Sequence, residues 1–490
     1  MTAGPDASAG YRGKVYLRSG CAQNPIGERF VGLEELVATM GANGLKLYAS
    51  KTTSLTAGPD GIIGANDVVV IKINYQWTDR GGTNTDVLRG LVRMIIDHPD
   101  GFTGEVVIAE NTQNRSNENF DRSTNNAQDI SLSPRDIEQS FRARGRRVSI
   151  ADWRAIASTP VGEYSTGDMA DGYVLGEHQP AIGGRPSYPK FKTADGSYVS
   201  LKYGTWTESS GYDRERLALI NVPVLKSHHA QYGATACVKN YMGLVTCELE
   251  TNAHWAMGQG LMGSVIGELE PAQLHILDAV WINADPYSGP ATSYAEATRR
   301  DALVAGIDPV AADIWAVKNI LVPAFIENGH TPPWPEPSAD PDDPNSAFRR
   351  YLDSSMQEIL AAGYDVTNDL EAVDLFDLAP PGTVSDPRGA GAPFSIRRLA
   401  DAYELSWSVP PTGGPVDTYY LYRTRLDAPE ARARPECETE LGSGSSAVLS
   451  YLPQGYGFIV VGHNLAGDGS FGFDSRGAER PSPRALDVCP

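Results

Sequence analysis

Cysteine is scarce in this chain, with five in 490 residues. None of them forms the close CxxC pairs of zinc ribbons or ferredoxins, so we expect neither a sulfur-ligated structural metal nor an iron–sulfur cluster. Cys437 and Cys489 lie near the carboxyl end and are expected to form a disulfide in an oxidising compartment. Cys237 and Cys247 either pair with each other or are small buried thiols.

Basic residues are outnumbered: there are 41 Lys and Arg against 61 Asp and Glu, and the formal net charge is -20. The chain therefore lacks the clustered Lys and Arg that nucleic-acid backbones and anionic membrane surfaces require, and neither is an expected partner. No apolar run approaches the roughly 18 residues of a membrane helix, so no membrane span is expected. The amino-terminal residues MTAGPDASAG lack the pattern of a secretion signal, so the protein is either cytoplasmic or exported with its signal removed.

Common nucleotide and hydrolase motifs are also missing. There is no GxxxxGK[ST] phosphate loop and no GxSxG nucleophile elbow, and the glycines at 258, 260 and 263 follow no clear strand,. The hydrophobic content of 41% predicts a globular protein, and a prior of roughly 150 residues per domain predicts about two to four domains.

A strand, a helix and a strand succeed one another early in the chain. Residues 67–74 are rich in β-branched side chains, Thr85 and Asp86 are expected to cap an amphipathic helix, and residues 105–109 form the next apolar run,. This order predicts the crossover unit of an α/β fold with a mostly parallel sheet and flanking helices. Three further elements are expected: strands at residues 217–225 and 274–280, and a helix at residues 308–317, capped by Asp308 with Pro309 in its first turn.

The α/β domain is expected to span residues 1–378 and to contain a long polar insertion at about residues 112–216. One helix is expected within the insertion, at residues 133–144, capped by Ser133. A span of this length with little regular structure is either a lid or binding loop over the sheet edge, or a surface elaboration. Residues 379–393 are rich in Pro and Gly and are expected to be a linker.

Short alternating strands follow the linker, in residues 394–490. They are expected at residues 405–409, 418–423, 447–451 and 457–461, and this spacing predicts a small all-β sandwich. The sequence from Leu405 to Trp407, the aromatic run at residues 420–423 and the turn that begins at Asn464 together resemble a fibronectin type III module. The resemblance implies that Trp407 packs in the core of the sandwich.

The densest group of functional side chains lies at residues 223–243. A compact set of cations and imidazoles is unusual in so acidic a chain, and it suits an anionic group or a metal. Cys237 is interpreted as a buried thiol rather than a nucleophile. The members of the group are Lys226, His228, His229, Cys237, Lys239 and Asn240.

Five motifs occur in one order along roughly residues 45–325 and together resemble the Domain of Unknown Function 362 family. The resemblance implies an α/β domain found across bacteria and archaea, sometimes exported and sometimes fused to ferredoxin modules, and it implies no particular reaction. It favours Lys226, His228, Lys239 and Asn240 as site residues, whereas His229 beside His228 departs from the family pattern. The motifs are VIKIN at 70–74, TNTDV at 83–87, VPVLKSH at 222–228, VKNYMG at 238–243 and GIDPVA at 306–311.

Functional side chains follow several expected strands where those strands end. Because ligands of open α/β sheets bind at the carboxyl ends of parallel strands, we expect these side chains to converge in one crevice. The lysines would hold a carboxylate, phosphate or sulfate, the amides would orient it, and one lysine or His228 would transfer protons. The proposed catalytic residues are Lys226, His228 and Lys239, and the proposed ligand-binding residues are Lys72, Asn74, Glu110 and Asn240.

A second interpretation of the same crevice is a divalent metal site. Imidazole and carboxylate ligands suit zinc, iron or manganese, although no HExxH pair is present. The expected ligands are His228, His254 and Asp278, with His275, Glu110 and Asp308 as further candidates. Asp308 is explained more simply as a helix cap.

These features lead to two hypotheses for function. The first is an exported enzyme that acts on an anionic small molecule or polymer end. The second is a non-catalytic extracellular protein that binds a ligand or metal and is tethered by its fibronectin-like domain. Fibronectin type III modules in bacteria resemble spacers on secreted depolymerases, which favours an extracellular or periplasmic location and contact with a surface or polysaccharide.

Overall fold

The chain folds as two compact units, Met1–Phe376 and Asp377–Pro490. The computed structural model describes residues 10–21, 27–114, 119–121, 126–128, 130–229, 231–377, 395–398, 402–407, 418–425, 436–449, 456–464 and 467–468. The linker predicted at residues 379–393 lies outside the described residues.

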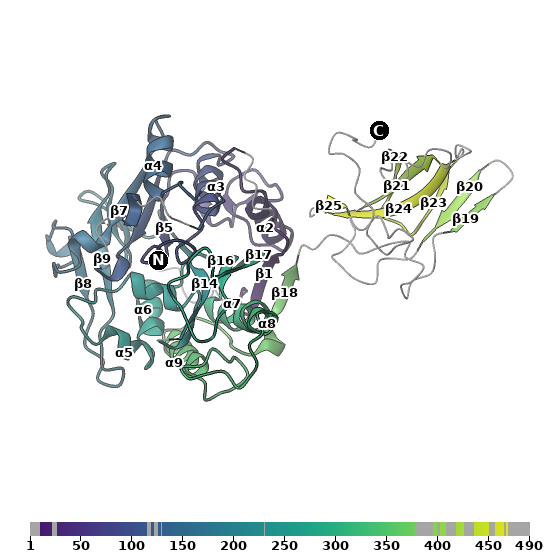
Figure 1. Cartoon of the computed structure of the whole chain (residues 1–490). Helices are drawn as coiled ribbons and strands as arrows, with labels where there is room; N and C mark the ends of the chain where they lie inside the picture. Colours follow the sequence, from purple (N-terminus) through teal and green to yellow (C-terminus); the bar gives the residue numbers. More distant parts are fainter. Residues whose placement is uncertain are drawn as a thin grey trace. The chain divides into compact units, whose positions relative to one another are not determined.

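A large ten-stranded sheet forms the centre of the first unit (Figure 1). Eight strands lie in the order β18-β1-β17-β16-β13-β5-β6-β7, while β14 pairs with β16 and with β15. The strands are β1 (Lys14–Arg18), β5 (Val68–Ile73), β6 (Glu105–Glu110), β7 (Val148–Asp152), β13 (Leu217–Val222), β14 (Val224–His228), β15 (Gly233–Thr235), β16 (Leu274–Asn283), β17 (Ala297–Gly306) and β18 (Asp374–Asp377).

This sheet is mixed, so the prediction of a mostly parallel sheet is only partly confirmed. The strands β16, β13, β5, β6 and β7 run parallel to their neighbours in this order. β17 is antiparallel to both β16 and β1. No helix lies between β16 and β17, and without a crossover the chain returns in the opposite direction. The sequence prediction missed β17 and β1 altogether.

Helices cover both faces of the large sheet. Figure 1 shows α2, α3 and α4 on one side and α6, α7 and α9 on the other. The helices are α2 (Val31–Ala42), α3 (Thr85–Ile96), α4 (Pro134–Arg142), α5 (Ala253–Met257), α6 (Leu261–Leu269), α7 (Pro309–Ala316), α8 (Val322–Glu327) and α9 (Ala347–Ala361). Shorter turns are η1 (Thr112–Asn114), η2 (Asn119–Asp121), η3 (Trp153–Ile156), η4 (Tyr164–Thr166), η5 (Lys239–Gly243), η6 (Val317–Leu321) and η7 (Leu370–Ala372).

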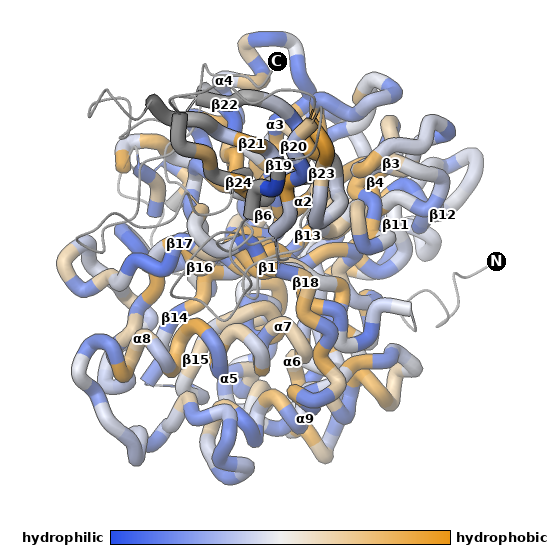
Figure 2. Tube along the Cα trace, turned by 90° about the vertical axis from the view of Figure 1, so that its right-hand side faces the viewer, coloured by the Kyte–Doolittle hydropathy of each residue, from blue (hydrophilic) through white to orange (hydrophobic). Residues whose placement is uncertain are grey.

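Alternation along the strands divides the core into two clusters. In β5, Val68 and Val70 belong to the cluster under α6, α7 and α9, whereas Val69 and Ile71 belong to the cluster under α2, α3 and α4. This is the period of two expected for a strand with both faces covered. By the same alternation, Lys72 lies on the face of Val68 and Val70. Figure 2 shows hydrophobic residues concentrated on the sheet strands, with hydrophilic loops around them.

The helix after β5 begins one residue earlier than the predicted caps. Asn84, not Thr85 or Asp86, is the N-cap of α3, and its side chain accepts from the backbone N–H groups of Asp86 and Val87. Val87, Leu91 and Ile95 are buried as expected from their helical spacing,.

The polar insertion contains much more regular structure than predicted. Ser133 caps α4, with Pro134 in the first turn as expected, and β7 then adds a strand to the edge of the large sheet,. Its remaining strands form a separate five-stranded antiparallel sheet, and no helix lies between consecutive strands of it,. They are β8 (Gly172–Leu175), β9 (Ser187–Lys192), β10 (Tyr198–Ser200), β11 (Gly204–Thr207) and β12 (Gly211–Asp213). A three-stranded sheet precedes β5 and comprises β2 (Tyr48–Ala49), β3 (Ala57–Gly58) and β4 (Ile63–Gly64).

The helix predicted after Asp308 is longer than expected. Asp308 accepts from the backbone N–H groups of Val310 and Ala311, and the helical path continues through α7, η6 and α8. Among the described residues, the stretch Pro309–Glu327 is long and apolar enough to cross a membrane by length and composition alone. Because 67% of its most apolar window is buried and its side chains join the core cluster under α7, we interpret it as a core helix.

The second unit contains small antiparallel sheets. β19 (Ser395–Arg398), β20 (Tyr403–Ser406) and β23 (Ser446–Leu449) form one sheet, and β22 (Glu436–Gly442), β21 (Thr418–Arg425), β24 (Tyr456–Asn464) and β25 (Gly467–Asp468) form another. Trp407 is buried in a cluster with Leu405, Tyr419, Leu421 and Val460, which draws on both sheets. The predicted disulfide between Cys437 and Cys489 lies outside the described residues, since Cys489 and the side chain of Cys437 are not described.

Candidate active site

A buried ion pair joins the ends of β5 and β6. Lys72 Nζ donates to a carboxylate oxygen of Glu110, and both side chains are almost completely buried. The ammonium also donates to the carbonyl oxygen of Ile73 at 2.8 Å and to Asn240 Oδ1 at 3.1 Å. Burial lowers the pKa of Lys72 and raises the pKa of Glu110, and the opposite charge of the partner counteracts each shift,.

Amide side chains extend this pair across the sheet. Asn240 Nδ2 donates to Asn221 Oδ1 at 2.7 Å, and Asn221 Nδ2 lies 3.0 Å from both the carbonyl oxygen of Cys237 and His275 Nδ1. Burial lowers the pKa of His275 to about 3, so its imidazole is neutral at physiological pH. The network fixes Asn240 against the strand ends, and the predicted ligand-binding role of Asn240 is accompanied by a structural one.

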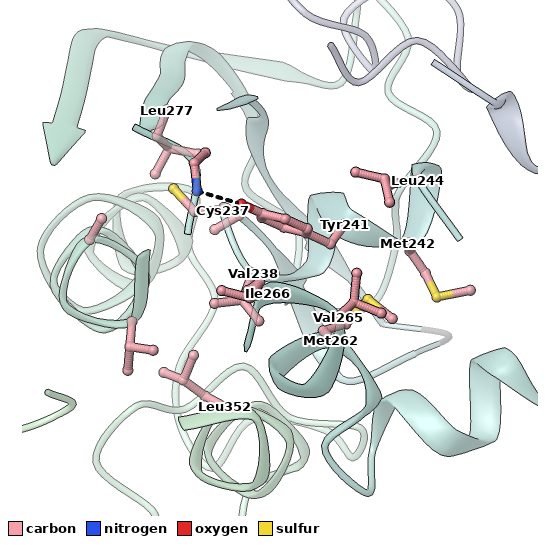
Figure 3. Packing of buried hydrophobic residues seen from close by; sticks show 14 of the residues in the cluster. Cys237, Val238, Tyr241, Met242, Leu244, Met262, Val265, Ile266, Leu277 and Leu352 are labelled. Carbon is pink, nitrogen blue, oxygen red and sulfur yellow. Dashed lines mark hydrogen bonds between the residues drawn. The ribbon is translucent and has the colours of Figure 1, made fainter. Parts of the chain in front are cut away.

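The turn η5 carries Lys239 and Asn240 because its other side chains pack into the core. Figure 3 shows Val238, Tyr241 and Met242 among the apolar side chains of α6, and Tyr241 Oη accepts from the backbone N–H of Ala272 at 3.1 Å. Tyr241 and Met242 are thus buried in the apolar cluster, while Lys239 and Asn240 bond to the polar groups at the strand ends.

Two positions hold η5 close to the ion pair. The carboxylate of Asp313, in α7, accepts from the backbone N–H of Cys237 at 2.6 Å and of Val238 at 3.0 Å. At the other end, a Cβ on Gly243 would lie 2.2 Å from Glu110 Oε1 and 2.5 Å from Lys72 Nζ. Only glycine fits there, because the backbone passes directly over the ion pair.

Lys226, in the middle of β14, is buried and forms hydrogen bonds with neutral partners only. Its ammonium donates to Asn74 Oδ1 at 3.2 Å and to the carbonyl oxygen of Gly81. Burial is the main cause that lowers its pKa to about 7, and the charge of Lys239 lowers it further. The predicted neighbours Lys226 and Asn74 are therefore in direct contact.

Lys239 and His228 form a second pair of functional groups. Lys239 Nζ lies 2.8 Å from His228 Nδ1, which is also 2.9 Å from the hydroxyl of Thr235 in β15. Burial lowers the pKa of Lys239 to about 7 and, with the charges of Lys239 and Lys226, holds the pKa of His228 well below its ordinary value. When Lys239 is an ammonium it donates to Nδ1, so the neutral imidazole carries its proton on Nε2.

The site holds more positive charge than negative charge. Lys72 is compensated by Glu110, but among the described residues neither Lys226 nor Lys239 forms an ion pair. Buried charges are normally paired. The two lysines therefore either lose protons near neutral pH or receive an anion that is not part of the chain.

The predicted metal ligands do not come together. No group of three or more His, Cys, Asp or Glu side chains suitable for a metal occurs in the described part of the chain. Asp278 lies on the α3 side of the sheet, where it accepts from the backbone N–H of Asn84 at 2.9 Å and from Asn126 Nδ2 at 3.2 Å. Its carboxylate thus faces the start of α3, and strand alternation separates it from His275 on the same strand. The described residues therefore do not group His228, His254 and Asp278 around one point.

The remaining metal candidates have other partners. Asp308 accepts four backbone N–H groups, from Gly13, Val310, Ala311 and Thr367. His254 Nε2 lies 3.0 Å from Gln113 Oε1. These contacts are those of a helix cap and of a hydrogen-bonded imidazole.

The loop after β6 is strained beside this site. Thr112 and Gln113 have φ values of 51° and 48°, which non-glycine residues rarely adopt,. Gln113 is held there by His254 and by a bond from its backbone N–H to Asn111 Oδ1 at 2.9 Å. Unfavourable backbone conformations of this kind are found more often at functional sites than elsewhere.

The neighbouring residues of the cluster have lesser roles. His229 donates its backbone N–H to Ser288 at 3.0 Å, and its ring packs against Tyr287. Cys237 and Cys247 are free thiols, and burial raises the pKa of Cys237 well above its ordinary value. Cys237 is thus a buried thiol, as predicted, and not an activated nucleophile.

Sequence reasoning missed several residues that build the site. Asn221 was visible only as one polar residue inside the apolar run LALINV, and Thr235 and Gln113 carry no motif. Asp313 reads as an ordinary helical residue, since its contact with η5 joins segments far apart in the sequence. A buried carboxylate in an apolar helix, AADIWA, is the one signal that was available,.

Comparison with protein families supports the resemblance of the main domain. Residues 210–318 match the sequence profile described as Domain of unknown function (DUF362). This segment contains Lys226, His228, Lys239, Asn240 and Asp313, but not Lys72 or Glu110. No match was found among curated proteins.

Proposed function

We propose that the protein is an enzyme that binds the oxyanion group of a small molecule or polymer end and transfers a proton to or from it. The observation that carries this proposal is the pair of buried lysines, Lys226 and Lys239, which form no ion pair among the described residues. Two buried ammonium groups without a counter-charge are unfavourable. A carboxylate, phosphate or sulfate between them would supply the missing charge.

The contacts of the two lysines favour different roles. Lys226 donates to two neutral oxygens, from Asn74 and Gly81, which favours its charged form and suits it to hold an anion. Lys239 contacts an imidazole instead. With its pKa at about 7, Lys239 is suited to act as a general base, and the Nε2–H of His228 is suited to donate to the bound anion. Lys72, Glu110 and Asn240 then position these groups.

Anion binding tests the proposal directly. We expect sulfate and inorganic phosphate to bind the full chain at pH 6.5, because Lys226 and Lys239 are then mostly protonated. Isothermal titration calorimetry measures this binding. The variants Lys226→Met and Lys239→Met should each weaken binding about tenfold or more, the usual loss when one charge-assisted contact is removed.

A surface lysine provides the control for these variants. Lys318 is partly exposed and pairs with Asp342, so Lys318→Met should leave anion binding unchanged. Sulfate binding that is equally tight in the wild type and in both site variants would remove Lys226 and Lys239 from the site.

The pH dependence of binding follows from the same pKa values. Both lysines have a folded pKa of about 7, below the unfolded value of about 10.4, so their charge is complete below pH 7 and is lost as the pH rises through 7. Sulfate affinity should therefore fall about tenfold between pH 6 and pH 8 for each lysine whose charge is required. Titrations at three pH values and constant ionic strength measure this slope, and a flat profile would contradict it.

A turnover screen separates catalysis from binding alone. Phosphate, sulfate and carboxylate compounds are incubated with the wild type and with Lys239→Met and His228→Ala. Turnover that disappears in both variants, while sulfate still binds to His228→Ala with reduced affinity, supports the enzyme. Binding of sulfate without turnover of any compound favours a non-catalytic ligand-binding protein.

The second unit favours an extracellular location, whether the protein is an enzyme or a non-catalytic ligand-binding protein. Its strands in two antiparallel sheets around the buried Trp407 support the proposed fibronectin type III-like sandwich. On this basis we propose an extracellular or periplasmic protein whose terminal unit contacts a surface or polysaccharide. A mass measurement before and after reduction and alkylation tests the disulfide between Cys437 and Cys489 that this location permits.

A further inference from the structure

A cavity of about 380 Å³ lies next to His254 in the first unit. It is in the size range of small-molecule pockets, and its lining includes Tyr232, Trp255, Glu336 and Arg350. Two connections link it to the lysine site. Gly233, the residue after Tyr232, pairs with His228 between β15 and β14, and the charge of His254 helps to lower the pKa of His228.

The walls of this cavity are held in place before any ligand binds. Tyr232 has a φ of 60°, unusual for a non-glycine residue,. Its hydroxyl donates to the carbonyl oxygens of His254 at 3.1 Å and of Trp255 at 3.2 Å. Its ring passes over Gly258, where an added Cβ would lie 2.5 Å from it. This strained contact fixes the short helix that presents Trp255.

Trp255 offers an aromatic face that the fold does not use. Its side chain is 59% exposed, although it packs on Gly183, where an added Cβ would lie 2.3 Å from the indole ring. Large exposed aromatic residues beside a pocket are typical of binding surfaces. Polar groups surround the indole: Glu336 and Arg350 line the same cavity, and neither forms an ion pair among the described residues.

We propose that this cavity binds a sugar ring, and that the substrate is an acidic saccharide whose anionic group lies between Lys226 and Lys239. This inference rests on the proposed function. A sugar ring has C–H faces that pack on an indole and hydroxyl edges that bond to carboxylate, amide and guanidinium groups. Glu336 accepts from the backbone N–H of Ser338 and Arg350 donates to the carbonyl oxygen of Asn345. A purely apolar ring would displace water from their remaining polar atoms without replacing its hydrogen bonds.

Binding of simple probes to the full chain tests the inference. Glucuronate is compared with acetate and sulfate, which carry only the anion, and with glucose, which carries only the ring. Glucuronate should bind at least about tenfold more tightly than acetate, because it fills both parts of the site. Trp255→Ala should weaken glucuronate binding about three- to tenfold, the usual worth of an aromatic contact, and should leave sulfate binding unchanged. Trp255→Phe should retain most of the affinity for glucuronate.

The control and the contrary outcomes separate this inference from the proposed function. Tyr203 is a partly exposed aromatic residue in the insertion, and Tyr203→Ala should bind glucuronate as the wild type does. Equal affinity for glucuronate and acetate would overturn the sugar assignment while the anion site stands, and so would benzoate binding more tightly than glucuronate. The anion site would be overturned, while the cavity assignment stands, if glucose bound as tightly as glucuronate and if both affinities were the same in Lys226→Met. If no probe binds, both proposals are overturned.

Discussion

Replacing Lys72 with methionine is expected to lower the free energy of unfolding by about 3–5 kcal/mol, the usual cost of leaving one partner of a buried ion pair uncompensated. Glu110 is buried beside it, and no second cation forms an ion pair with its carboxylate among the described residues. Urea denaturation of the full chain at pH 7, followed by tryptophan fluorescence, measures the change.

The pH dependence of this variant has a defined sign. Burial raises the pKa of Glu110 in the folded protein, and the largest opposing influence on this pKa, the charge of Lys72, is removed in the variant. The penalty of Lys72→Met is therefore largest where Glu110 is ionised, and it is relieved as the pH falls through the folded pKa. The double variant Lys72→Met with Glu110→Gln should recover much of the loss, because no unpaired charge remains.

A partly exposed ion pair gives the control for Lys72. Lys202 and Glu268 are paired with 28% and 33% of their side chains exposed, so Lys202→Met should cost about 1 kcal/mol or less. If Lys72→Met is no more destabilising than Lys202→Met, the ion pair is not the structural centre of the site.

Replacing Asp313 with alanine is expected to cost about 2–5 kcal/mol, because two buried backbone N–H groups, of Cys237 and Val238, lose their acceptor,. The same change should weaken sulfate binding about tenfold or more, a loss comparable to that of a removed charge-assisted contact, since η5 and its Lys239 are released from α7. Asp313→Asn keeps one acceptor oxygen and should have an intermediate effect. Urea denaturation and calorimetry together measure both consequences.

A distant acidic residue gives the comparison for Asp313. Asp342 is exposed in its pair with Lys318, and Asp342→Ala should change neither stability nor sulfate binding. Sulfate affinity that stays at the wild-type level in a folded Asp313→Ala protein would show that Asp313 does not position Lys239.

The local parts of the fold were predictable from the sequence, because local signals determine them. The β-branched run at residues 67–74 predicted β5, and Asp308 with Pro309 predicted the start of α7,. The antiparallel β17 was missed, because three consecutive charged residues in its first half, Arg299, Arg300 and Asp301, obscure the apolar pattern of its second half. Pairing between segments far apart in sequence leaves no local pattern of this kind.

The same limit applies to the site. The lysines and asparagines near strand ends were predictable, because the carboxyl ends of parallel strands meet at one edge. The direct contacts of Lys72 with Glu110 and Asn240, and of Lys226 with Asn74, agree with that expectation. Which face a residue takes depends on exact register, and a single position decides it. This is why Asp278 was assigned to the crevice although it faces α3.

The neighbouring strands β18 and β1, at one edge of the large sheet, bring the beginning and the end of the first unit together. β1 pairs with β17, as in the register of Tyr16 with Ala305, and β18 then adds the last strand beside β1. During synthesis on the ribosome, β1 leaves the exit tunnel before the other strands of this sheet and has neither of its partners until β17 has followed. The strands β5, β6 and β7 can pair early, so the sheet grows from that edge towards β1, and β1 is among the last of its strands to be paired,.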